Sequence, residues 1–370
     1  MELGDVKPRV SKGPPAFGRR EKARRVMLAA ALSLAAFVPA RLRESREPAP
    51  CAQAALEASR TMSRALAAVA RHAPSAPSAP DEEIDPNRTG LIGREADELM
   101  TSLGNLEAKR TTTNPNFAGL LVHLLCRAGV HPGSRIAIGS SGSFPALLLA
   151  SLAAARALEA EPVAIISLGA SSYGATGAGF NLLHLYELLL REGVFSTPPA
   201  AVTLGGERDV GLGFDPELRE RLIRRISDTG LPFIQEPDLR SNVRMRMRIY
   251  GDVAAFINIG GAYANLGTSS RVLELQPGLN RRVPLPPESR RGVIAEMAAR
   301  GVPVIHLLYI KGLAAKYGLP WDPVPLPQPG DWTPPARPGL LFHAVAAAYF
   351  VLLALIALPR PRAARAHQSP

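Results

Sequence analysis

Residues 134–151 read SRIAIGSSGSFPALLLAS. The apolar run at 135–139 predicts a short buried strand, and GSSGS at 139–143 predicts a flexible polar turn. Helix formers follow from Phe144, and Pro145 falls in the first helical turn, where proline is tolerated. This strand–turn–helix unit leaves backbone N–H groups and three hydroxyls at a helix N-terminus, which suits a carboxylate or phosphate. The alternative is a tight turn in which Ser143 only caps the helix.

The same alternation of strands and helices continues along the chain. Several strands, such as VAII at 163–166, are uninterrupted apolar runs, so both of their faces must be covered. We therefore expect an α/β fold: a mainly parallel sheet with helices on both faces. The expected helices are 51–72, 94–106, 116–129, 144–159, 180–192, 216–228, 238–250, 289–300 and 309–317. The expected strands are 135–139, 162–168, 200–204, 232–235, 254–259, 271–275 and 303–307.

The charge of the chain is concentrated at its ends. The 370 residues carry a formal net charge of +11. Residues 1–25 contain eight basic and three acidic residues, and residues 359–370 contain three arginines and no acid. Residues 26–358 carry a net charge of only +3, and no basic run is interleaved with aromatic residues. We therefore expect no nucleic-acid partner.

Two uncharged segments adjoin these basic ends. Residues 339–358 (GLLFHAVAAAYFVLLALIAL) would span about 30 Å as a helix, so they predict a transmembrane helix. Residues 26–40 are a shorter run, which predicts an uncleaved anchor or a signal peptide. The positive-inside rule places the C-terminal tail in the cytoplasm. If residues 26–40 are an uncleaved anchor, the N-terminus lies in the cytoplasm as well. Residues 41–337 are then extracytoplasmic.

This interpretation divides the chain into seven parts. The expected order is a basic cytoplasmic N-terminus (1–25), the anchor or signal peptide (26–40), a juxtamembrane helix and Pro/Ser linker (41–84), an extracytoplasmic α/β domain (85–327), a Pro-rich spacer (328–338), the transmembrane helix (339–358) and a basic cytoplasmic tail (359–370). A disulfide between Cys51 and Cys126 is permitted outside the cell, but nothing in the sequence indicates it.

Four expected strands run into loops rich in glycine. These loops are 139–143, 169–179, 205–213 and 260–267. Because ligands bind at the carboxyl ends of strands in open α/β sheets, the loops predict a ligand cleft there. The alternative is that short turns simply favour Gly and Ser. The candidate ligand-binding residues are Gly139, Ser140, Ser141, Gly142, Ser171, Ser172, Gly205, Gly206, Asn258, Gly260 and Gly261.

Catalytic candidates rest on weaker patterns. The chain lacks the G-x-S-x-G, Walker A and H-E-x-x-H motifs, so we expect neither a metal nor a cofactor. Lys109 with Ser143 or Ser172 would make a nucleophile–base pair, and Asp209 lies in a glycine loop that suits a general base. The alternative is structural: an ion-paired Lys109 and a turn-forming Asp209. The arginines at 240–248 predict a solvated helix face.

The α/β region, roughly 85–327, also resembles a known family. The strings that carry the resemblance include TGLIGREADELMTSLGNLEAKRTTTNPNFAG (89–119), LGGERDVGLG (204–213) and FINIGGAYANLG (256–267). The chain resembles the bacterial poly-γ-glutamate system proteins. The resemblance implies a protein of the cell membrane, associated with the ligase and membrane components that make and export poly-γ-glutamate. It carries over no catalytic residue, and it assigns ATP-dependent amide formation to a cytoplasmic partner.

The sequence therefore predicts a membrane-anchored accessory component of poly-γ-glutamate biosynthesis and export. Its extracytoplasmic cleft would handle a carboxylate-bearing polymer or partner proteins. One alternative is an extracytoplasmic hydrolase or transferase acting on γ-glutamyl amide bonds. Another is a scaffold whose glycine loops are only turns.

Overall fold

The computed structural model describes residues 24–35, 37, 51–72, 83–333 and 340–357. The chain divides into two compact units, Met1–Pro48 with Ala336–Pro370, and Ala49–Pro335. Several predicted parts lie wholly or partly outside the described residues: 1–23 of the basic N-terminus, 38–40 of the anchor, 41–50 and 73–82 of the juxtamembrane segment, 334–338 of the spacer, and all of the basic tail (359–370).

The unit Ala49–Pro335 is built on one six-stranded sheet, in the order β5–β3–β2–β6–β8–β7. All neighbouring pairs are parallel except β7 with β8. The predicted α/β class with a mainly parallel sheet is therefore confirmed. The strands are β2 (Arg135–Ser141), β3 (Glu161–Ser167), β5 (Ala201–Thr203), β6 (Ala255–Ile259), β7 (Gly278–Asn280) and β8 (Val304–Leu307).

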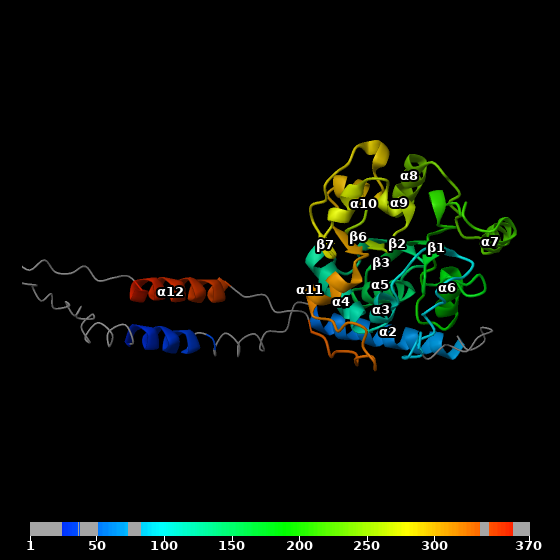
Figure 1. Cartoon of the computed structure of the whole chain (residues 1–370). Coiled ribbons are helices and arrows are strands. Elements are labelled where there is room, and N and C mark those ends of the chain that lie inside the picture. Colours follow the sequence, from blue (N-terminus) through cyan, green and yellow to red (C-terminus); the bar gives the residue numbers. More distant parts are fainter. Residues whose placement is uncertain (1–23, 36, 38–50, 73–82, 334–339, 358–370) are drawn as a thin grey trace, which may run out of the picture. The chain divides into compact units, whose positions relative to one another are not determined.

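Helices cover both faces of this sheet, as the apolar strands require (Figure 1). In β2, Ile136 and Ile138 join one core cluster, whereas Ala137 joins the other. The first cluster is formed with α2 (Ala52–His72), α4 (Asn116–Ala128), α5 (Pro145–Ala157), α6 (Leu182–Arg191), α7 (Pro216–Asp228) and α11 (Ile310–Tyr317). The second is formed with α8 (Leu239–Tyr250) and α10 (Val293–Ala299), beside α9 (Tyr263–Leu266).

Three expected elements are wrong. Residues 94–106 do not form one helix, because β1 (Met100–Ser102) and a turn precede α3 (Leu106–Thr112). β1 pairs with β4 (Ala170–Ser171) in a second, two-stranded sheet. Residues 232–235 make only an isolated bridge, and residues 271–275 lie mostly in a 3₁₀ helix, Ser270–Glu274. The segments PFIQ (232–235) and RVLEL (271–275) are too short for periodicity to separate a strand from other structure.

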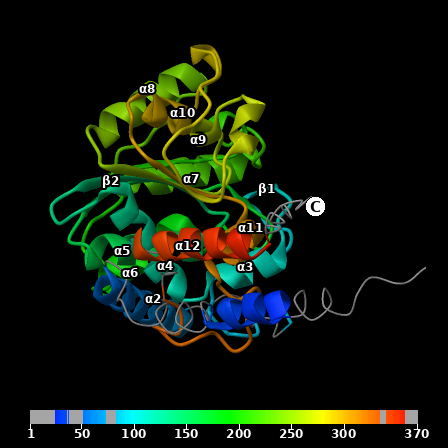
Figure 2. The same ribbon diagram turned by 90° about the vertical axis from the view of Figure 1, so that its left-hand side faces the viewer.

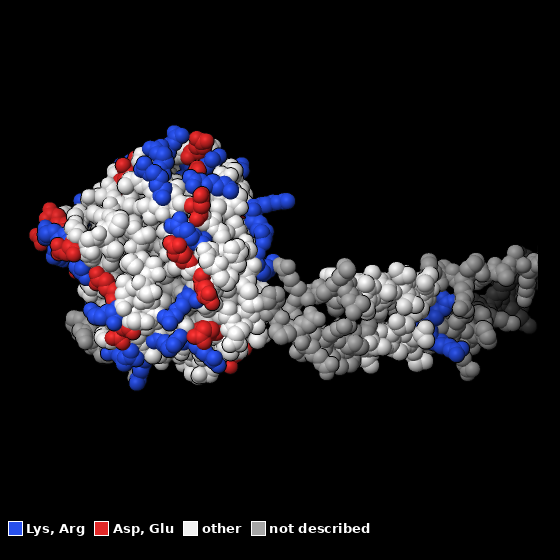
Figure 3. Space-filling view, turned by 180° about the vertical axis from the view of Figure 1, so that it is seen from behind, with Lys and Arg blue, Asp and Glu red and all other residues white. Residues whose placement is uncertain are grey.

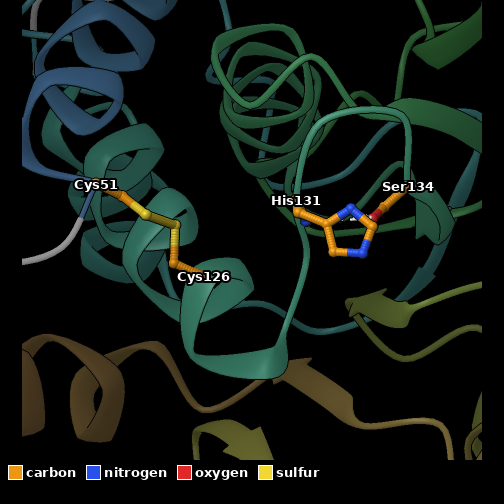
Figure 4. The surroundings of a disulfide bond; sticks show 4 residues. All are labelled: Cys51, Cys126, His131 and Ser134. Carbon is orange, nitrogen blue, oxygen red and sulfur yellow. Dashed lines mark hydrogen bonds between the residues drawn. A yellow bond between two sulfur atoms is a disulfide. The ribbon is translucent and has the colours of Figure 1, made fainter.

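Helix α2 belongs to the α/β unit and packs against α4 and α5. Met62 and Val69 are fully buried on its inner face. A disulfide between Cys51 and Cys126 joins the start of α2 to the end of α4 (Figure 4). Figure 4 also shows His131 and Ser134, which share a 3.1 Å hydrogen bond before β2. The compact unit thus begins before Asp85, where the sequence placed the domain boundary.

The other unit contains helical residues 24–35 and helix α12 (Leu340–Ala357), the red helix in Figures 1 and 2. Ser33 Oγ and Tyr349 Oη share a 2.5 Å hydrogen bond between these two helices. In the parts of the chain that the structure describes, no helix combines the length and the apolar character needed to cross a membrane. The end residues of the predicted span, Gly339 and Leu358, lie outside the described residues.

Candidate functional site

A pocket of about 780 Å³ lies at the carboxyl ends of the parallel strands. All five strands contribute to its wall: Gly206 follows β5, Gly169 follows β3, Ser143 follows β2, Gly261 follows β6 and Tyr309 follows β8. The chain leaves β2 toward β3 and later returns to β6 on its other side. This change of direction is the switch point at which doubly wound sheets bind ligands.

The buried Lys109 is the central polar side chain of this pocket. Its Nζ lies 2.6 Å from Ser171 Oγ, and it also donates to the carbonyl oxygen of Ser143. The same nitrogen lies 4.1 Å from the ring centroid of Phe144. Lys109 is 2% exposed, and burial lowers the pKa of its ammonium to about 7. A neutral amine in contact with a hydroxyl is the arrangement that a nucleophile–base pair requires.

Local structure explains how Lys109 and Ser171 meet. Asn105 caps α3, with its side chain accepting a 2.8 Å hydrogen bond from Ala108 N–H, and Lys109 follows in the same first turn of helix. Ser171 lies in β4, which is held by β1, and its N–H donates to Ser143 Oγ at 3.0 Å. Ser143 therefore orients the Ser171 backbone. The helix cap of α5 falls on Phe144 and involves no side-chain hydrogen bond, so the interpretation of Ser143 as a cap is wrong.

Gly104 keeps the Ser171 hydroxyl approachable. A Cβ at this position would lie 3.2 Å from both Ser171 Oγ and Lys109 Cε, and 2.5 Å from the carbonyl oxygen of Ser172. Gly104 was not among the predicted site residues, because residues 94–106 were expected to form one helix. The Gly104–Asn105 pair just before α3 is a turn-and-cap signal that could have exposed the error.

The structure brings together only part of the predicted set. The predicted partners of Lys109 were Ser143 and Ser172, but the hydroxyl it contacts is that of Ser171. Ser172 Oγ donates instead to the sulfur of Met100 at 3.3 Å. Among the candidate ligand residues, the pocket is lined by Ser141, Ser171, Gly205, Gly206 and Gly261. The candidates that are not among its lining residues are Gly139, Ser140, Gly142, Ser172, Asn258 and Gly260.

The side chain of Asn258 is buried and stabilises a turn of the backbone. Its Nδ2 donates to the Gly260 carbonyl at 2.9 Å and lies 3.2 Å from His306 Nδ1. It therefore holds the turn after β6, where a positive φ of 75° favours the glycine at position 260.

Asp209 is not placed to act as a general base. It is fully buried and pairs with the equally buried Arg246 at 2.6 Å. Its carboxylate also accepts hydrogen bonds from Thr203 Oγ1 at 2.9 Å and Asn242 Nδ2 at 3.0 Å. The prediction that the arginines of 240–248 all lie on a solvated face is likewise wrong at Arg246. These buried hydrogen bonds and the ion pair hold the turn after β5 in place.

Among the described residues, no group of three His, Cys, Asp or Glu side chains is placed to hold a metal ion. Charged side chains of both signs are interspersed over the face of the α/β unit seen in Figure 3. No family model, curated protein or solved structure compared with this chain matches it.

Proposed function

We propose that the α/β unit is a serine–lysine hydrolase or transferase that acts on amide bonds, with γ-glutamyl amides as its substrates. The observation that carries this proposal is the 2.6 Å contact between Lys109 Nζ and Ser171 Oγ inside the pocket. Ser171 is the nucleophile, Lys109 is its general base, and Ser143 and Gly104 position the pair. The γ-glutamyl substrate rests on the resemblance described for residues 85–327.

The reaction proceeds through an acyl-enzyme. Ser171 Oγ attacks the amide carbonyl carbon while its proton passes to Lys109 Nζ. The carbon–nitrogen bond then breaks, and the departing amine takes the proton from Lys109. In hydrolysis, water attacks the Ser171 ester, gives a proton to Lys109, and Lys109 returns it to Ser171 Oγ. In transfer, the amine of a second chain replaces the water.

The same proposal includes the setting of the protein. The chain is held at a bacterial cell membrane by residues 26–40 and 339–358, with the α/β unit outside and both termini inside, among the components of a poly-γ-glutamate system. The uncharged runs and their basic flanks support membrane attachment. The Cys51–Cys126 disulfide supports an extracytoplasmic location, because disulfides persist in oxidising compartments.

The test uses the purified full-length protein and γ-linked glutamate oligomers. We expect shortened or lengthened chains by mass spectrometry, no turnover in Ser171→Ala, and a rate lowered by about 10²–10⁴ in Lys109→Met. Ser172→Ala is the matched control, since its hydroxyl faces Met100. A fluorophosphonate probe should label the wild type and Ser172→Ala, but not Ser171→Ala.

Two outcomes would count against this proposal. Turnover that survives Ser171→Ala would place the chemistry elsewhere. Salt-sensitive binding of the oligomers with no change in their length, and no probe labelling, would favour a polymer-handling component without catalysis. In that case the pocket would be a binding cleft for a carboxylate-bearing chain.

A further inference from the structure

Two charged side chains of the pocket wall, Glu207 and Lys311, lie at opposite ends of the row of strands. Glu207 lies in the turn after β5, and Lys311 lies in the first turn of α11, after β8. In the sheet, β5 and β8 are separated by β3, β2 and β6. With neighbouring strands about 4.8 Å apart, the two turns lie roughly 19 Å from each other across the sheet.

The reactive pair lies nearer to the acidic end. Ser171 lies in the loop after β3, which neighbours β5, and its N–H is bonded to Ser143 Oγ in the loop after β2, so about one to two strand spacings separate it from the turn that carries Glu207. About two to three spacings, roughly 10–14 Å, separate it from the strand that leads to Lys311. A second acid of the pocket wall, Glu107, precedes Lys109 by two residues in α3, which also packs against α11, so it lies between the two ends.

The two ends also differ in their surfaces. Near Glu207 the wall is formed largely by the backbone of Gly169, Gly205 and Gly206. At the other end it carries two exposed aromatic rings, Tyr309 at 62% exposure and Trp321 at 36%. Lys311 Nζ lies 5.8 Å from the Trp321 ring centroid. One end therefore carries an acid beside glycine backbone, and the other carries aromatic rings and a lysine.

We propose that the pocket binds an extended amide in one direction, with an ammonium on its acyl end beside Glu207 and carboxylates on its leaving chain beside Lys311. This inference rests on the proposed function of Ser171 and Lys109. Opposite charges at the two ends favour this direction and oppose the reverse one. One to two strand spacings on the acyl side leave room for about one γ-glutamyl unit, because its main chain has two more atoms than that of an ordinary residue, which spans at most about 3.6 Å. The enzyme therefore removes or transfers units from the amino end of a chain.

The experiment compares a γ-linked glutamate tetramer with its N-acetylated form, using the full-length protein. We expect the first products of the free tetramer to be one amino-terminal unit and a trimer. Acetylation removes the ammonium, so kcat/KM should fall at least tenfold. In Glu207→Gln the ratio of kcat/KM for the free tetramer to kcat/KM for the acetylated tetramer should fall toward one. Glu217→Gln changes an exposed acid of α7 and is the matched control, so it should keep the ratio of the wild type.

A second measurement tests the role of Lys311 in binding the leaving chain. Lys311→Met should raise KM for the tetramer more than KM for γ-glutamyl anilide, whose leaving group carries no carboxylate. Lys316→Met changes an exposed lysine of the same helix outside the pocket wall and serves as its control.

The outcomes separate the two proposals. Cleavage that depends on Ser171 but begins in the middle or at the carboxyl end, or that ignores acetylation, overturns the direction and leaves the proposed function standing. Turnover that is independent of Ser171, or no turnover of either tetramer, overturns both.

Discussion

The replacement Lys109→Met tests whether the pocket holds a neutral amine. An ordinary lysine has a pKa of about 10.4, whereas burial lowers the pKa of Lys109 to about 7. The gap corresponds to about 5 kcal/mol. Between these pH values the unfolded chain binds a proton that the folded chain does not. The stability contributed by Lys109 is therefore fully present above about pH 10.4, is lost as pH falls toward 7, and is constant below that.

The magnitude can be measured in an accessible range of pH. Between pH 6 and pH 9, the free energy of unfolding of the wild type should rise by roughly 2–3 kcal/mol relative to Lys109→Met. Urea unfolding of the full-length chain is suitable, because the fluorescence of both tryptophans, Trp321 and Trp332, reports on the α/β unit. Ser172→Ala removes no titrating group, so its difference from the wild type should not change with pH.

A difference between wild type and Lys109→Met that stays within about 0.5 kcal/mol from pH 6 to pH 9 would refute this reasoning. Lys109 would then be an ordinary ammonium in the folded chain. The assignment of Lys109 as a general base at neutral pH would fail with it.

Other groups give further expectations, each measured by urea unfolding. Asp209→Asn leaves Arg246 buried without its ion pair and should lower the free energy of unfolding by about 3–5 kcal/mol. Glu288→Gln removes an exposed ion pair and should lower it by under about 1 kcal/mol. Equal losses in the two variants would contradict this expectation. Burial lowers the pKa of His306 to about 4, so its contribution is present above about pH 6.5 and lost as pH falls toward 4. The wild type should therefore lose about 3 kcal/mol more than His306→Gln over that range. Cys51→Ser opens a disulfide that spans 75 residues and should cost about 4 kcal/mol. Dithiothreitol should weaken the wild type similarly and leave the variant unchanged.

Local pattern was enough to predict the architecture of the α/β unit. Strands β2, β3 and β6 and helices α5, α7 and α8 lie close to the predicted ranges. Their apolar spacing and turn residues are properties of neighbours in the chain, so they can be interpreted without a fold. The same patterns placed glycine-rich loops at the strand ends, and the pocket lies there.

The partners of the polar side chains depended on tertiary structure. The sequence marked Lys109 as a candidate base and predicted Ser143 or Ser172 as its partner. The hydroxyl that meets it is that of Ser171, which lies in β4 and is held there by pairing with β1. In the same way, the glycine loop around Asp209 predicted a general base, whereas in the folded chain Asp209 is paired with the buried Arg246 of α8.

The sequence by itself determined the fold class, the position of the strand-end loops and the candidacy of Lys109. Only the tertiary structure decided which hydroxyl meets that lysine and which charges are buried together. The physical reason is that hydrophobic periodicity is encoded within each element, whereas contacts between side chains depend on strand order and on segments far apart in the chain. Burial then changes the chemistry, since the lowered pKa of Lys109 arises from the packing around it.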